Sequence, residues 1–156
     1  MRVLSLIVLL LTSSAWADDA EKLLGNWKLV SFFTEDVQTK QRVNTYGENP
    51  MGAIGFTLAG RYFAFLTADG RKAPQTQEEQ AAAYRTMIAY TGKWRVEGDK
   101  FITKVDVAWN PAWVGTEQAR FWRVEGNKLF LTSAPIPNPN AAGSMVIATV
   151  VWEREQ

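Results

Sequence analysis

The chain has 156 residues, with 17 Lys and Arg against 16 Asp and Glu, and it contains neither Cys nor His. The lack of His excludes imidazole general bases and histidine zinc sites, and the lack of Cys excludes disulfides, thiolate nucleophiles and iron–sulfur clusters. A formal net charge of +1 argues against an electrostatic nucleic-acid binder, because such proteins carry a basic surplus. We therefore expect one domain with no nucleic-acid partner, no metal and no cofactor.

The N-terminal residues have the pattern of a secretory signal peptide. Met1-Arg2 is a cationic start, an apolar run follows over 3–11, and Ala15-Trp16-Ala17 is a small-residue cleavage motif. We predict cleavage after Ala17, which makes residues 1–17 the signal peptide, and export to the periplasm or the medium. The mature domain, residues 18–156, is expected to have no membrane span, because a span needs about twenty consecutive apolar residues.

Short runs rich in aromatic and β-branched residues, separated by turn signals such as Ala59-Gly60 and Asp69-Gly70, follow a short helical segment predicted at 18–24. We predict strands over 26–33, 42–46, 51–58, 61–67, 91–97, 100–109, 117–124, 128–133 and 145–154. The Pro- and Asn-rich stretch 134–143 is expected to be a surface loop. Regular short strands joined by tight turns are typical of an all-β antiparallel meander, either a sandwich or an up-and-down barrel of about 8–10 strands.

One interposed helix is predicted near residues 77–90. Thr76-Gln77-Glu78-Glu79 has the spacing of a capping box, in which the Thr76 hydroxyl and the Glu79 carboxylate satisfy each other's backbone N–H groups. Ala81, Tyr84 and Ile88 then recur at helical spacing. The apolar stripe of this helix either closes one mouth of the barrel or packs on its outer wall.

Strand alternation around Arg120 suggests a polar group inside the fold. Gln118, Arg120 and Trp122 share one face of the strand that begins at Glu117, and we expect that face to point inward. An inward Arg needs partners, so Arg120 is the best candidate for holding a carboxylate, phosphate or carbonyl of a ligand. The alternatives are an internal salt bridge with Asp106 or Glu48, or an outward-facing set with Phe121 in the core.

Aromatic residues supply candidate lining for a ligand. Those expected to contact it are Phe63, Phe65, Tyr90, Trp94, Trp109, Trp113 and Trp122. Trp109 and Trp113 flank Asn110-Pro111, so they form either an aromatic wall at the mouth or a surface packed on the helix. Large rings accommodate a flat apolar ligand, but they can equally fill the interior.

Catalysis would have to use carboxylates or tyrosines. The weak candidates for a catalytic acid or base are Glu48, Asp106, Glu117 and Tyr90. No spacing motif demands such chemistry, and Asp106 beside Lys104 is equally consistent with a solvated strand face.

Several segments resemble a known family when they are taken in order. Gly25-Asn26-Trp27 opens the first strand and Trp152-Glu153-Arg154 closes the last, as in lipocalins. Together with Tyr46–Gly52, Ile88–Gly92 and Asn110–Arg120, they resemble the bacterial and fungal lipocalin-like domain family, which is distinct from the long-chain lipocalins. The resemblance implies a closed calycin-type barrel in which Arg154 stacks over Trp27 and closes one end, but it implies no defined reaction.

The leading interpretation is therefore an exported lipocalin-like barrel that binds a small apolar or amphipathic molecule, with no indication of its oligomeric state. The second hypothesis is an isomerase or cyclase of the kind found among small barrels such as allene oxide cyclase, using a carboxylate or Tyr as acid–base. The third is a barrel filled by its own side chains, acting as a structural or interaction module.

Overall fold

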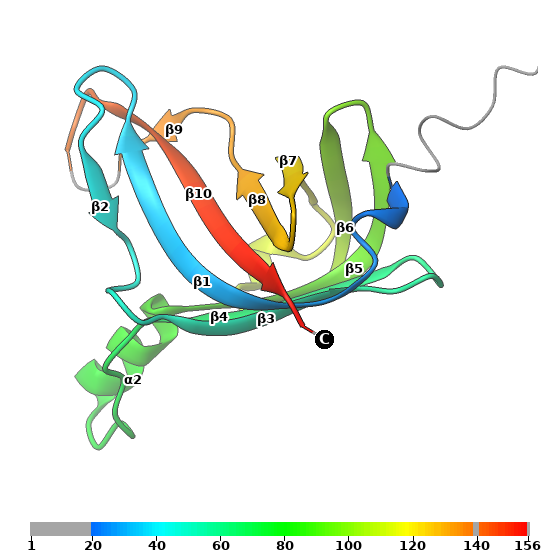
Figure 1. Cartoon of the computed structure of the whole chain (residues 1–156). Coiled ribbons are helices and arrows are strands. Elements are labelled where there is room, and N and C mark those ends of the chain that lie inside the picture. The colour runs from blue at the N-terminus through cyan, green and yellow to red at the C-terminus, as the bar shows by residue number, and fades with distance from the viewer. Residues whose placement is uncertain (1–19, 139–140, 156) are drawn as a thin grey trace, which may run out of the picture.

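Over residues 20–138 and 141–155, which the computed structural model describes, eight antiparallel strands close into a barrel (Figure 1). The barrel strands are β1 (Gly25–Asp36), β3 (Met51–Phe56), β4 (Arg61–Thr67), β5 (Met87–Glu97), β6 (Lys100–Ala108), β7 (Glu117–Glu125), β8 (Lys128–Thr132) and β10 (Met145–Arg154). Two short strands, β2 (Arg42–Asn44) and β9 (Ile136–Pro137), extend the pairing at the edges of β1 and β10. The predicted signal peptide lies outside the described residues.

Closure of the barrel depends on β1 and β10, which are far apart in the sequence. Their register runs from Trp27 opposite Arg154 to Asp36 opposite Val146, with one irregularity between Leu29 and Ser31. Within the barrel each strand otherwise pairs with its neighbour in the chain, apart from the short β2 and β9. This pairing gives the predicted up-and-down barrel rather than a sandwich.

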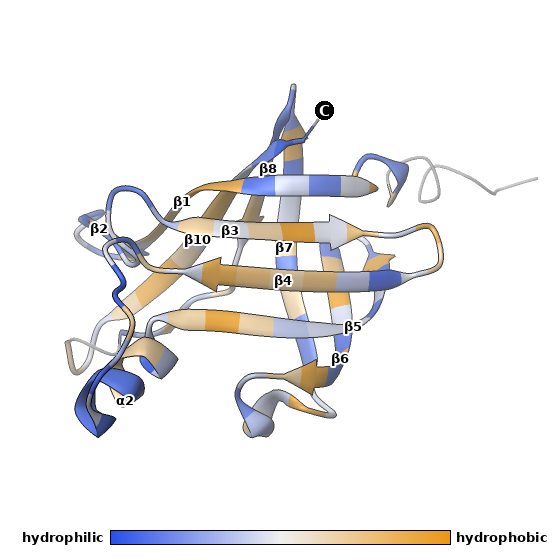
Figure 2. Ribbon diagram, turned by 90° about the horizontal axis from the view of Figure 1, so that it is seen from below, coloured by the Kyte–Doolittle hydropathy of each residue, from blue (hydrophilic) through white to orange (hydrophobic). Residues whose placement is uncertain are grey.

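Alternation along each strand separates an inner from an outer face. On β4 the inner residues Tyr62, Ala64 and Leu66 are buried, whereas Phe65 is 56% exposed. The apolar colouring of β3, β4 and β5 in Figure 2 therefore includes residues of both faces. The core is formed by the inner faces of the strands and by Leu23, which precedes β1.

The predicted helix exists but is shorter than expected. Helix α2 (Gln77–Arg85) has the capping box at its N-terminus: Glu79 N–H donates to Thr76 Oγ1 over 3.2 Å, and Thr76 N–H donates to Glu79 Oε2 over 3.2 Å. The chain does not continue as helix to residue 90, because β5 begins at Met87 and pairs with β4, placing Ile88 opposite Leu66. Burial of Ile88 and Tyr90 in the barrel thus overrides the helical spacing.

Helix α2 neither plugs the barrel nor forms part of its core. No residue of the helix is buried, and the helix is mostly hydrophilic in Figure 2. Tyr84 is 45% exposed, and its hydroxyl donates to the carbonyl of Trp109 over 3.3 Å. The helix therefore flanks the end of the barrel at which β4 ends and β5 begins.

The structure differs in part from the sequence predictions for the segment before β1 and for the stretch 134–143. The segment before β1 contains a helical turn at residues 20–21, while residues 18 and 19 lie outside the described part. The stretch predicted as a loop at 134–143 includes β9, which pairs with the start of β10. No helix among the described residues is long and apolar enough to span a membrane.

Candidate functional site

A central cavity lies inside the barrel, between its aromatic floor and the end flanked by α2. Its volume is about 70 Å³, and it is partly open to the outside. The residues that line it come mainly from inner strand faces and are Phe32, Tyr62, Ala64, Leu66, Ile88, Tyr90, Trp113, Arg120, Leu131, Ala148, Val150 and Trp152. Since one water needs about 10–15 Å³ on this measure, the cavity has room for a few waters or for one small ligand.

Aromatic rings fill the part of the barrel below the cavity. The Phe56 ring lies 4.8 Å from the Tyr62 ring, 5.1 Å from Trp94 and 5.3 Å from Phe101, measured between centroids. Side chains thus fill this part of the barrel, while the cavity remains above it. This arrangement explains why the large rings neither occupy the whole interior nor all line the cavity.

The barrel end below these rings is closed by Trp27 and Arg154. Trp27 is fully buried, and its indole N–H donates to the carbonyl of Leu23 over 2.9 Å. The Arg154 guanidinium carbon lies 4.0 Å from the centroid of the Trp27 ring. Arg154 also donates to the carbonyls of Leu24 and Lys22 over 2.6 and 2.7 Å.

Arg120 brings a positive charge to the cavity wall. Its side chain is half-buried, and Nη1 donates to the carbonyl of Ala119 over 2.7 Å. Among the described residues, no carboxylate lies within ion-pair distance of its guanidinium. The internal salt bridges considered from the sequence are not formed, because Asp106 pairs with Arg61 on the outer face and Glu48 accepts a bond from Asn44.

Tyr62 and Tyr90 stand beside Arg120 in the same wall. Both are buried, with ring centroids 5.5 Å apart. Burial raises the pKa of each hydroxyl, and the nearby Arg120 charge opposes that rise in both. Both hydroxyls therefore stay protonated at neutral pH, and each can donate a hydrogen bond as well as accept one.

Trp152 adds an indole N–H without an acceptor. The side chain is 1% exposed, lines the cavity, and its Nε1 has no hydrogen-bond partner in the described part of the protein. Thr103 Oγ1 and Trp122 Nε1 are also buried without partners, but neither residue lines the cavity. An unpaired buried donor is costly, so an acceptor that reached the Trp152 N–H would be stabilised by it.

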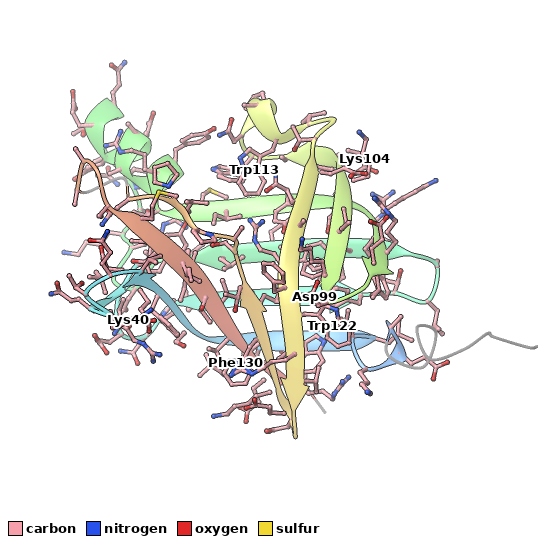
Figure 3. The ribbon with its side chains drawn as sticks, turned by 90° about the horizontal axis from the view of Figure 1, so that it is seen from above. Lys40, Asp99, Lys104, Trp113, Trp122 and Phe130 are labelled. Atoms are coloured by element: carbon pink, nitrogen blue, oxygen red, sulfur yellow. The ribbon has the colours of Figure 1, made fainter. Side chains whose placement is uncertain are left out.

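Three of the residues predicted to contact a ligand line the cavity: Tyr90, Trp113 and Arg120. Trp113 comes from the short helix η1 (Pro111–Trp113) between β6 and β7, at the same end of the barrel as α2 (Figure 3). Its ring lies 5.3 Å from Tyr90 and 4.9 Å from Trp109. Trp109 contacts Trp113 from outside the cavity, and its backbone carbonyl accepts a hydrogen bond from Tyr84 of the helix. Trp113 therefore belongs to the cavity wall, whereas Trp109 connects that wall to the helix.

The prediction that Phe63 and Phe65 line the interior is wrong. Both lie on the outer face of β4, because Tyr62, Ala64 and Leu66 take the inner positions. Their rings contact each other with centroids 6.3 Å apart.

Three other predicted contact residues lie near the interior but away from the cavity. Trp94 packs on Phe56 in the floor and donates to the carbonyl of Thr57 over 3.3 Å. Trp122 packs against the core beside Asp99, at a distance from Trp113 (Figure 3). Gln118 is half-buried and donates to the hydroxyl of Thr116 over 3.0 Å.

The carboxylates considered for catalysis all lie away from the cavity. Asp106 is held 2.6 Å from Arg61, and Glu117 is 2.9 Å from Arg95. Hydrogen bonding to Arg95 lowers the pKa of Glu117, and the same interaction raises that of Arg95. Glu48 is exposed. Tyr90 is thus the sole weak catalytic candidate that reaches the cavity wall.

Several lining residues were missed from the sequence, notably Tyr62, Trp152 and Phe32. Tyr62 was missed because both faces of β4 carry aromatic rings, so alternation within that strand does not say which face is inward. Trp152 faces the interior because β10 pairs with β1, which places Trp152 opposite Leu29. The sequence around Trp152 does not indicate this long-range pairing.

The described residues contain no group of three or more acidic, His or Cys side chains that could hold a metal ion. Residues 24–155 match the family model described as a lipocalin-like domain. A search of curated proteins finds no match to this chain.

Proposed function

Because the chain belongs to the lipocalin-like domain family, we propose that it binds a small, largely apolar molecule in the central cavity of its barrel. The observation that carries this proposal is the cavity itself, which remains inside a barrel whose floor is filled with aromatic rings. A barrel filled entirely by its own side chains would have no such space. The interaction-module hypothesis is therefore the weaker one.

The chemistry of the wall supports an apolar ligand with one polar end. Leu66, Ile88, Leu131 and Val150 contribute aliphatic surface to the cavity, and Arg120, Tyr62 and Tyr90 are the lining residues with charged or hydroxyl side chains. Burial of a ligand's apolar part would contribute roughly 25 cal/mol for each Å² removed from water. Arg120 would orient the polar end.

Binding is favoured over acid–base catalysis by the location of the carboxylates. A general base must reach its substrate proton within about 3 Å or through one water. Glu48, Asp106 and Glu117 do not line the cavity, and two of them are paired with arginines on the outer surface. An isomerase would have to rely on a tyrosine such as Tyr90, and burial raises the pKa of Tyr90, so its hydroxyl stays protonated at neutral pH and is not available as a base.

The proposal includes export, which rests on the sequence of residues 1–17. The mature protein would then reach its ligand in the periplasm or the medium. Intact mass measurement on protein from those fractions should give a chain that begins at Asp18. A chain that keeps residues 1–17 and stays in the cytoplasm would contradict export without affecting the binding proposal.

Binding is tested by native mass spectrometry on protein purified without denaturation, comparing wild type with a variant whose cavity is filled. Ala148→Phe introduces a ring into the cavity wall, whereas Thr149→Phe adds the same ring to the opposite face of the same strand. We expect a co-purifying small molecule, or added 1-hexanol, to bind wild type and Thr149→Phe but not Ala148→Phe. Equal binding to all three folded proteins would refute the cavity as the site.

A further inference from the structure

Arg120 and Trp152, which both line the central cavity, carry hydrogen-bond donors and no acceptor in their side chains, and this asymmetry favours a ligand that supplies acceptors. Arg120 contributes a guanidinium with no carboxylate within ion-pair distance in the described chain, and Trp152 an indole N–H with no acceptor. Tyr90, which also lines the cavity, adds a hydroxyl that can donate a hydrogen bond. Among the residues that the structure describes, no Asp or Glu side chain lines the cavity.

Two of these groups have an electrostatic or hydrogen-bonding requirement that the described part of the protein does not satisfy. A partly desolvated guanidinium lacks a counter-charge, and a fully buried indole N–H lacks an acceptor. A neutral ligand with a single carbonyl could satisfy the indole but would leave the guanidinium uncompensated. An anionic group satisfies both.

We propose that the cavity takes a small monocarboxylic acid in its ionised form, with the carboxylate held by Arg120, Tyr90 and Trp152 and a short apolar tail along the aliphatic wall. This inference rests on the proposed function, whose ligand it specifies. One positive charge with two neutral donors matches one negative charge, and the guanidinium fork matches the two oxygens of a carboxylate. A phosphate dianion would leave excess negative charge in an otherwise apolar cavity.

The size of the cavity limits the acid. A volume of about 70 Å³ is far below the roughly 300–1,000 Å³ typical of sites for drug-sized ligands. The tail is therefore short, or it extends toward the open end past Trp113. Hexanoate is a probe of suitable size, and hexanamide and 1-hexanol are uncharged molecules with the same tail.

Calorimetric titration of the mature protein with these three probes near neutral pH tests the inference, with inorganic phosphate as a tail-free anion. We expect hexanoate to bind at least about tenfold more tightly than hexanamide or 1-hexanol, and phosphate to bind more weakly than hexanoate. In proton–nitrogen correlation spectra, the assigned Trp152 indole resonance should shift on addition of hexanoate. The shift with 1-hexanol should be smaller.

Substitutions of Arg120 distinguish the contribution of its guanidinium to hexanoate affinity from effects of a general disturbance of the barrel. Arg120→Met should weaken hexanoate binding by about ten- to a hundredfold and 1-hexanol binding by a much smaller factor, because only hexanoate loses a charge-assisted hydrogen bond. Arg120→Lys keeps the positive charge but lacks the two parallel N–H donors of the guanidinium, so its affinity for hexanoate should lie between those of wild type and Arg120→Met. Arg123→Met, on the outer face of the same strand, is the matched control and should leave all affinities unchanged.

The outcomes distinguish this inference from the proposed function. If the three six-carbon probes bind equally and Arg120→Met changes none of them, the carboxylate inference is refuted while binding in the barrel stands. If phosphate competes as well as hexanoate, the site is an anion site without a tail, and the inference is again refuted. If no probe binds wild type, and no co-purifying molecule is found, both proposals fail.

Discussion

Removal of the Arg154 guanidinium is the most direct test of how the barrel is closed. Arg154 connects three parts of the molecule: it stacks over Trp27 at the start of β1, it lies near the end of β10, and it donates to two carbonyls of the segment before β1. Arg154→Met retains most of the apolar stem but loses the charge and its donors. The helical turn, the first strand and the last strand then lose their shared contact.

The expected cost can be worked out from these contacts. Hydrogen bonds to a charged group contribute about 1.5–3 kcal/mol, but the freed carbonyls of Lys22 and Leu24 can regain water, so we take the lower value for the pair together. The cation–π contact adds about 0.5–2 kcal/mol over a ring that is fully buried. We therefore expect Arg154→Met to reduce the free energy of unfolding by about 2–4 kcal/mol, a fall of roughly 4–16 °C in Tm.

Arg123→Met is the control for this measurement. Its guanidinium carbon lies 3.9 Å from the Phe130 ring centroid, but it is an exposed contact on the barrel's outer face. Because exposed cation–π pairs contribute about 0.5–1 kcal/mol, this change should be small. Urea unfolding followed by tryptophan fluorescence gives both values. A loss at Arg154 no larger than that at Arg123 would refute the role given to the closed end.

Two further predictions concern packing and pH. Gly92→Ala should destabilise the protein by about 1–3 kcal/mol or more in urea unfolding, because an added Cβ would clash with the backbone carbonyl of Lys104; a neutral effect would contradict the strand register at this position. The free energy of unfolding should fall as pH rises above about 10. Burial raises the pKa of Tyr46 to about 12 from an ordinary value of 10.0, and it also raises the pKa values of Tyr62 and Tyr90. Between about pH 10 and 12 the unfolded chain therefore releases protons that the folded protein retains, which favours unfolding. Urea midpoints measured at increasing pH check this, and a midpoint that does not change up to pH 12 would contradict it.

The strands and the helix cap could be predicted because their signals are local. Alternation of apolar residues and turn-forming glycines lie within a few positions of each other, and the capping box of Thr76 and Glu79 is complete within four residues. The end of the helix was missed for the opposite reason. Residues 87–90 have helical spacing, but pairing of β5 with β4 is a contact across about twenty residues of chain that propensity does not describe.

The candidate site divides in the same way. Alternation predicted that Arg120 faces inward, and the structure places it in the cavity wall. The choice between Tyr62 and Phe63 as inward residues could not be made from β4 alone, since both faces of that strand carry rings and a one-residue change of register exchanges them. The burial of Tyr62 reflects packing on Phe56 from the neighbouring β3 and on Phe101 from β6, two strands away.

By itself, the sequence determined the fold class and the absence of His and Cys chemistry, and it indicated one inward arginine. These properties depend on composition and on short-range periodicity. Only the tertiary structure decided that, within the described chain, no carboxylate lies within ion-pair distance of Arg120, and that Trp152 lines the cavity with an indole N–H that has no acceptor. Both facts depend on which residues meet across a barrel closed between β1 and β10, and that closure is a long-range pairing.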